Sequence, residues 1–240
     1  MNNINIAFFL AFIAGFSTLV GLVFIFLKIK EEHIIICSSL AFASGVMLSI
    51  SIFDLIPSAI RLLYNYNILY VFLFMVIGIC LSSAIDYFIG SDDSLYKVGI
   101  ISMIGIIMHN IPEGILTFIT CTKDIKLGVS LAIVIAIHNI PEGISIGIPI
   151  FYSTNSKIKT FSYTFIAAFS ELLGAIITYL FLINYINNFI LGILFSVIAG
   201  IMIQISLLEL LPVANSYNNK LLVRIFFIFG FVLMIINLLF

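Results

Sequence analysis

Long apolar runs alternate with short polar breaks along the whole chain. A membrane-spanning helix needs about 20 apolar residues, because backbone groups inside lipid must bond to one another. Eight runs reach that length: residues 4–27, 34–58, 67–89, 97–119, 127–149, 160–183, 189–212 and 221–240. The breaks, such as KIKEEH, NYN and GSDDSLYK, are too short to hold a soluble domain. The pattern predicts an all-α membrane protein with a single transmembrane domain over residues 1–240.

Composition narrows the class of protein further. Of 240 residues, 63% are apolar and 9% are charged, whereas a soluble domain carries about 25% charged residues. A soluble enzyme, or a soluble body with one anchor, is therefore excluded, and the lipid bilayer is the expected surrounding. A net charge of −1 without a basic tail argues against nucleic acid as a partner. The amino-terminal MNNINIAFF lacks the positive region of a signal peptide, so the first run should stay in the mature chain.

The basic residues predict how the chain is oriented in the membrane. One set of alternate loops and helix ends carries seven of them: Lys28, Lys30, Lys97, Lys157, Lys159, Lys220 and Arg224. The other set carries three: Arg61, Lys123 and Lys126. Because cytoplasmic loops carry the excess of lysine and arginine, the first set should lie in the cytoplasm. With eight spans, both termini are then extracellular, in a multi-pass protein of the cell membrane.

Two internal repeats lie within the apolar runs. The string HNIPEG occurs at 109–114 and again, identically, at 138–143. More weakly, GVMLSISIFDLIP at 45–57 matches GIMIQISLLELLP at 200–212, which pairs Asp54 with Glu209. In the predicted topology the members of each pair run in opposite directions. This favours inverted repeats in a 3+2+3 arrangement of helices, typical of secondary transporters. Chance similarity of apolar sequence is the alternative for the second pair.

Ionisable side chains inside the spans suggest the chemistry. The runs hold five such residues at depth: His109, Glu113, His138, Glu142 and Glu171. Each ionisable group at the bilayer centre costs about 2.5–3.5 kcal/mol on insertion scales. Neither lysine nor arginine lies deep in any run, so the buried charge is all potentially negative. A bound divalent cation is the natural counter-charge.

The spacing of these residues favours a metal site. Within each HNIPEG the histidine and glutamate are four residues apart and share one helix face. The asparagines that follow the histidines, Asn110 and Asn139, lie about 100° around the helix and can reach a second metal position. Imidazole nitrogen and carboxylate oxygen suit zinc, iron and manganese ions. The three cysteines form no thiolate cluster, which argues against copper(I). A single such motif could be a hydrogen-bonded helix contact, but two identical copies favour metal.

Other side chains have more than one interpretation. Glu171 could be a further ligand, or a protonated glutamate that joins two helices. Met47 could fill the core or ligate the metal. Asp54 and Glu209 could be plain helix-end carboxylates, or entrance and exit stations on opposite sides of the membrane.

The eight spans and the paired HNIPEG resemble the ZIP (Zrt/Irt-like protein) family of divalent-metal transporters, in its bacterial GufA and ZupT type branches. The resemblance covers nearly the whole chain. It implies a two-metal centre between the helices 97–119 and 127–149, and a sliding, elevator-like motion of one helix group against the other. The implied first site is His109, Glu113, His138 and Glu142, with Met47 as a possible addition. The implied second site is Asn110, Asn139 and Glu171, with Glu113 and Glu142 bridging the two; Asp54 would lie at the outer entrance and Glu209 at the cytoplasmic exit.

The sequence departs from the family in one loop. Many members carry a histidine-rich loop after the third span, whereas here the loop is GSDDSLYK, in which Asp92 and Asp93 could capture metal only weakly. Both motifs also carry His-Asn where relatives vary, so the preferred metal does not follow from the resemblance.

We therefore expect a transporter, not an enzyme, that moves zinc into the cytoplasm, with iron, manganese, cobalt and cadmium as related cargo and with no resident cofactor. Metal efflux, an intramembrane metal-dependent hydrolase and a metal sensor are the alternatives. The hydrolase lacks its usual HExxH signal. Long apolar faces on the second, third and eighth runs are compatible with a homodimer.

Overall fold

The computed structural model describes residues 3–26, 31–89, 94–182 and 185–238. Lys28, Lys30, Asp92 and Asp93, which the orientation and the loop prediction used, lie outside the described residues. Across the described ranges the regular structure is entirely helical. Eight helices are long and apolar enough to cross a membrane, which confirms the prediction of an all-α protein with eight spans.

The helices extend slightly beyond the predicted runs at most ends. Their bounds are α1 Asn3–Phe16, η1 Ser17–Phe26, α2 Glu32–Ile50, η2 Ser51–Leu55, α3 Ile56–Leu63, α4 Leu69–Ile89, α5 Ser94–Lys123, α6 Ile125–Thr154, α7 Lys157–Ile177, η3 Thr178–Leu182, α8 Asn188–Gln204, η4 Ile205–Leu210, α9 Leu211–Ser216 and α10 Lys220–Leu238. Pro149, where a predicted run ended, lies inside α6. The apolar pattern locates the buried part of a helix, whereas capping residues set its ends.

Polar side chains fix several of these ends. Asp124 accepts hydrogen bonds from the backbone N–H groups of Lys126 and Leu127, which starts α6 immediately after α5. Asn155 ends α6 in the left-handed conformation, with φ of 50°. Such caps satisfy backbone groups that the helix itself leaves unpaired. The breaks before and after α6 are therefore tight connections between consecutive helices.

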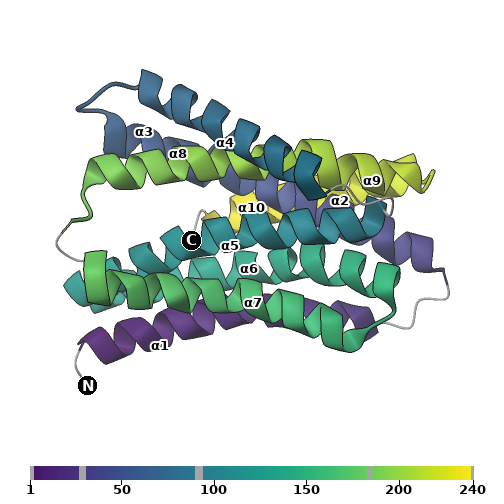
Figure 1. The fold of residues 1–240 in the computed structure, drawn as a ribbon, viewed down its shortest axis with the longest axis horizontal. Helices are drawn as coiled ribbons and strands as arrows, with labels where there is room; N and C mark the ends of the chain where they lie inside the picture. The colour runs from purple at the N-terminus through teal and green to yellow at the C-terminus, as the bar shows by residue number, and fades with distance from the viewer. Residues whose placement is uncertain (1–2, 27–30, 90–93, 183–184, 239–240) are drawn as a thin grey trace.

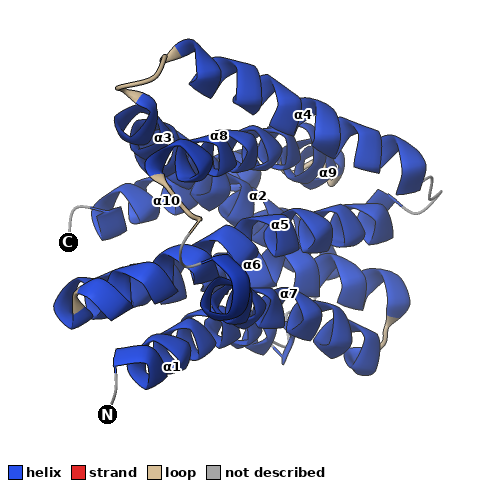
Figure 2. Cartoon of the chain, turned by 60° about the vertical axis from the view of Figure 1, so that its left-hand side comes forward, coloured by secondary structure: helices blue, strands red, loops and turns tan. Residues whose placement is uncertain are grey.

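The helices form two groups that lie against each other (Figures 1 and 2). One group, called the inner group, contains α1 with η1, α5, α6 and α7. In the other, whose members are called the outer helices, α2 packs on α10 and α4 packs on α8. The two groups meet where α2 crosses α6 and where α5 contacts α8. Only 17% of the most apolar stretch of α4, and the same share in α10, is buried, so these helices turn apolar faces outward. The start of α1 and the end of α10 lie toward the same end of the bundle (Figure 1).

Glycines let the outer helices approach closely in reciprocal pairs. A Cβ on Gly45 of α2 would collide with the carbonyl oxygen of Phe227 on α10, and a Cβ on Gly230 of α10 would collide with that of Phe42 on α2. The contact between α8 and α4 has the same form, with Gly200 against Met75 and Gly78 against Val197. Small residues at such crossings favour helix association in membranes, because they allow backbone-to-backbone contact.

Of the three π-helical turns in the described residues, η2, η3 and η4, two hold a carboxylate and precede a proline. The π-helical turn η2 holds Asp54 and precedes Pro57; the π-helical turn η4 holds Glu209 and precedes Pro212. Proline has no N–H to continue the helical ladder, and a widened turn accommodates it. In Figure 1, α3 and α9, which follow these turns, lie at opposite ends of the bundle. The weaker of the two sequence repeats therefore corresponds to a shared local structure.

One glycine contact in the inner group makes a stability prediction. A Cβ on Gly143 of α6 would collide with the backbone carbonyl oxygen of Thr18, so Gly143→Ala must separate two helices. We expect it to destabilise the protein by about 1–3 kcal/mol and to lower the midpoint of thermal unfolding, measured by circular dichroism in detergent. Gly147→Ala is the control, because there the added Cβ would collide with the far end of the Leu22 side chain, which can shift, and with no backbone atom. Equal midpoints for the two variants would contradict this contact.

Candidate metal centre

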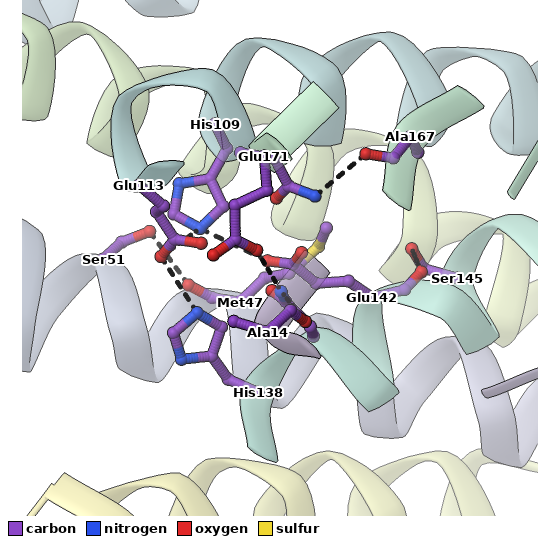
Figure 3. Close-up of polar contacts among 12 residues, drawn as sticks. Ala14, Met47, Ser51, His109, Glu113, His138, Glu142, Ser145, Ala167 and Glu171 are labelled. Atoms are coloured by element: carbon purple, nitrogen blue, oxygen red, sulfur yellow. Dashed lines mark hydrogen bonds and ion pairs between the residues drawn. The ribbon is translucent and has the colours of Figure 1, made fainter. Parts of the chain in front are cut away.

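The two HNIPEG strings lie on neighbouring helices in the middle of the inner group. His109 and Glu113 lie on α5, His138 and Glu142 lie on α6, and α5 packs directly against α6. All four side chains are buried. The helices continue through Pro112 and Pro141. Figure 3 shows the histidine and glutamate side chains converging.

Glu113 holds the centre of this cluster. Its Oε1 lies 2.9 Å from Nε2 of His138 and 3.1 Å from Nε2 of His109. Oε1 of Glu142 lies 3.4 Å from the same Nε2 of His109. His109, Glu113 and His138 each offer a ligand atom, and these three atoms lie within 4.8 Å of one another. Two imidazoles and two carboxylates around one point match the ligand types of zinc and similar ions.

A second group of polar side chains adjoins the first through α7 and α1. The Nδ2 atom of Asn139 donates to Oε2 of Glu171 at 2.9 Å and to the carbonyl oxygen of Ala14 at 2.9 Å. The Nδ2 atom of Asn110 donates to the carbonyl oxygen of Ala167 at 3.1 Å. Both amide groups are therefore oriented by a neighbouring helix, and both leave their oxygen atoms unused.

The unused oxygen atoms are the most informative feature of the centre. Within the described part of the chain, these buried oxygens have no hydrogen-bond partner: Oδ1 of Asn110 and Asn139, Oε2 of Glu113, both carboxylate oxygens of Glu142, and Oε1 of Glu171. Buried polar atoms are nearly always paired, so each such atom requires an explanation. Several such acceptor oxygens in one place offer a set of ligand atoms suited to a divalent cation.

A cavity connects the first group to one end of the bundle. It has a volume of about 230 Å³, and its walls include His109, Glu113 and His138 at the inner end. Asp54 and Arg61 line it as well, and Arg61 is exposed. Ser58 donates to Oδ1 of Asp54 at 3.3 Å, and Arg61 donates to Ser58 at 2.9 Å. Asp54 thus lies between the surface and the histidine–glutamate cluster.

Two further candidate residues, Glu209 and Met47, do not line this cavity. Glu209 accepts from Nε2 of Gln204 at 3.1 Å, and Oε1 of Gln204 accepts from Ser82 of α4 at 2.5 Å. It belongs to a polar chain at the end of the bundle opposite Asp54, outside the cavity just described. Met47 is buried on α2, and Figure 3 shows it in the region of the centre; the contact drawn there is made by its carbonyl oxygen, which accepts from Ser51.

Sequence reasoning missed what α1 contributes. The carbonyl oxygen of Ala14 carries no side-chain signal, although it orients Asn139. A repeat between the first and sixth spans, FIAGFSTLVG at 12–21 and FIAAFSELLG at 165–174, would have indicated that α1 and α7 contact the centre equivalently. It is visible only when the two spans are aligned with each other.

Fold and site together define a multi-pass membrane protein with a buried cluster of metal-ligating side chains at the inner end of a cavity. Comparison with known proteins agrees with that class. Residues 90–238 match the family described as ZIP Zinc transporter. A "Zinc transporter ZupT" of Clostridium perfringens (strain 13 / Type A) is 36% identical, over 100% of this chain and 97% of the relative. One of Streptococcus mutans serotype c is 37% identical, over 97% of this chain and 96% of the relative.

The chain belongs to the ZIP family, as its paired motifs predicted. This is a family of transporters rather than enzymes, and its metal ions are cargo rather than cofactors.

The geometry makes a prediction about zinc binding. His138→Ala removes an imidazole from the cluster, so we expect zinc affinity, measured by titration of the purified protein, to fall at least roughly tenfold. His33→Ala is the matched control, because His33 also lies beside a glutamate, at 3.4 Å from Glu31, but is exposed. Thermal unfolding without metal establishes that both variants are folded. Equal affinities for the two variants would place the zinc site elsewhere.

Proposed function

We propose that this protein transports zinc and related divalent transition-metal cations across the cell membrane into the cytoplasm. The main support is the set of unpaired, buried oxygen atoms around Glu113, which itself lines the inner end of a cavity that Asp54 also lines. Family membership and relatives named as zinc transporters support the same cargo. Iron, manganese, cobalt and cadmium use similar nitrogen and oxygen donors and are the related candidates.

In the proposed centre, one metal binds His109, Glu113, His138 and Glu142, with Met47 as an added ligand. A second metal binds Asn110, Asn139 and Glu171, with Glu113 and Glu142 bridging the two. The short distances from Glu113 to both histidines support the first site. The free oxygens of both asparagines and of Glu171 support the second. A divalent ion neutralises carboxylates that would otherwise remain unfavourably charged in an apolar bundle.

The proposed route begins at Asp54 and ends at Glu209. The cavity lined by Asp54 supports an entrance at the end shared by both chain termini. At the other end, hydrogen bonds from Gln204 to Glu209 and from Ser82 to Gln204 join α8 to η4 and α4, which supports a closed exit. Moving α1, α5, α6 and α7 as one group against the other helices would expose the centre to that side. The equivalent distortions at Asp54 and Glu209 support inverted repeats, in the 3+2+3 arrangement, as the basis of this motion.

Metal flux into proteoliposomes that hold a metal-sensitive dye tests the proposal. We expect saturable zinc influx for the intact protein and an influx rate at least roughly 100-fold lower for Glu142→Gln. Loss of a residue that only hydrogen-bonds to a metal ligand costs about 10–100-fold in affinity or activity, and loss of a direct ligand should cost more. Glu32→Gln is the control, because Glu32 is an exposed carboxylate at the start of α2.

The alternative functions predict other outcomes. Tight binding without flux for any ion would overturn transport and favour a sensor, and metal-dependent cleavage of a substrate would favour a hydrolase. Zinc accumulation in cells separates import, which raises it, from export, which lowers it.

The proposed orientation, with both termini outside, makes a separate prediction. In a Cys80→Ser background, a membrane-impermeant thiol reagent applied to intact cells should modify Asn65→Cys but leave Ser216→Cys unmodified until the cells are opened. Both positions are exposed: Asn65 follows the end of α3, and Ser216 is the last residue of α9. The reverse labelling would invert the orientation and turn the cavity toward the cytoplasm. A homodimer through apolar faces of the second, third and eighth spans stays a prediction; of these spans, the third (α4) and the eighth (α10) turn apolar faces outward, whereas the second is mostly buried.

A further inference from the structure

The first and sixth spans contact the centre in the same way. Residues 12–21, FIAGFSTLVG, and residues 165–174, FIAAFSELLG, are identical at seven of ten positions. In this alignment Ala14 matches Ala167, and Thr18 stands where the other copy has Glu171. The two alanine carbonyls each receive an asparagine amide from an HNIPEG motif. Each also accepts from the serine three residues later, Ser17 or Ser170, at 2.6 Å in both copies.

Glycine contacts confirm that Thr18 and Glu171 occupy equivalent places. A Cβ on Gly114, which follows Glu113, would collide with the carbonyl oxygen of Glu171. A Cβ on Gly143, which follows Glu142, would collide with the carbonyl oxygen of Thr18. Thr18 therefore packs against α6 beside one metal-site glutamate as Glu171 packs against α5 beside the other.

The hydroxyl of Thr18 is fully buried and has no hydrogen-bond partner among the described residues. A buried helical threonine usually donates to the carbonyl four residues earlier, as Thr164 does to Thr160 at 3.0 Å and Thr178 to Gly174 at 2.8 Å. For Thr18 that carbonyl belongs to Ala14, which already accepts from Ser17 and Asn139. The hydroxyl is thus left free for another partner.

The two copies also differ in the residue three positions before Glu171 and Thr18. A Cβ on Gly15 would come within 2.9 Å of Cβ and 3.3 Å of Oε2 of Glu171, so glycine makes room for that long side chain. The residue aligned with Gly15 in the other copy is Ala168. The copy whose partner is the acid therefore carries glycine at this position, and the copy whose partner is the hydroxyl carries alanine.

We propose that Thr18 is a further metal-binding residue, which gives the transported ion a neutral oxygen donor on the flank of the centre opposite Glu171. This inference rests on the proposed transport function. A neutral donor at this position adds an oxygen ligand without a fourth buried carboxylate, so the centre binds a divalent ion without holding it too tightly to release. Oxygen donors matter more to manganese than to zinc, which prefers imidazole, so Thr18 also contributes to the choice of ion.

Thr18→Val tests the proposal, because valine keeps the shape and removes the hydroxyl. In the proteoliposome assay we expect KM to rise roughly tenfold for zinc, as when a supporting ligand group is lost, and by more for manganese. Thr18→Ser should restore KM to within about twofold, since it returns the hydroxyl. Thr164→Val is the matched control, because that hydroxyl is equally buried but already bonded within its own helix. A purely structural role would change the amount of folded protein but not the ratio of the two KM values.

A double substitution tests the same idea in the opposite direction. Thr18→Glu with Ala168→Gly copies the acid and glycine of the other flank, so zinc affinity should rise at least tenfold while the maximal flux falls, because ligand charge count sets ion affinity. The role of Thr18 is overturned if Thr18→Val keeps the wild-type flux and KM and the double variant keeps the wild-type zinc affinity. That result would leave the transport function standing. Absence of flux in the wild type would instead overturn transport, and zinc titration of the same variants would still decide whether Thr18 binds metal.

Discussion

Three carboxyl groups, those of Glu113, Glu142 and Glu171, are held in the interior of an apolar helix bundle. Burying such groups without partners is strongly unfavourable, and the two histidines account for only part of the need. Glu113 contacts both imidazoles and Glu142 lies near one of them, but Glu142 and Glu171 keep oxygens that have no hydrogen-bond partner among the described residues. The cation proposed at this point would explain why two adjacent helices carry the same motif and why a cavity reaches it.

Close contact between helix backbones makes this arrangement possible. Glycines on α2, α4, α8 and α10 form reciprocal contacts in one group, and Gly114 and Gly143 bring α7 and η1 onto the metal-site helices in the other. Because these contacts lie within each group, they hold each group together as a unit. The two groups meet where α2 crosses α6 and where α5 contacts α8. In the proposed mechanism one group slides against the other, and the ligating side chains of α5, α6 and α7 would stay together because they belong to one group.

Much of this could be predicted from the sequence, because membrane burial and metal ligation both restrict residue types. The eight spans follow from apolar runs, and the HNIPEG pair places two histidines and two glutamates on facing helices. Helix ends were less predictable: Asp124 and Asn155 set them through caps, beyond the apolar pattern. The π-helical turns at Asp54 and Glu209 also escaped prediction, because the sequence shows the prolines but not the widened turn that precedes them. The roles of Ala14 and Ala167 depend on backbone carbonyls, which no side-chain pattern reveals.

The transported metal ion should occupy the space among the unpaired oxygens of α5, α6 and α7. Diffraction at the zinc absorption edge, from crystals of the intact protein soaked in zinc, would locate the ion. We expect an anomalous peak within bonding distance of Glu113 and His138, roughly 2.0–2.2 Å for nitrogen and oxygen ligands, with a weaker second peak toward Glu171. Zinc bound only at the exposed His33 and Glu31, with the centre empty, would contradict it.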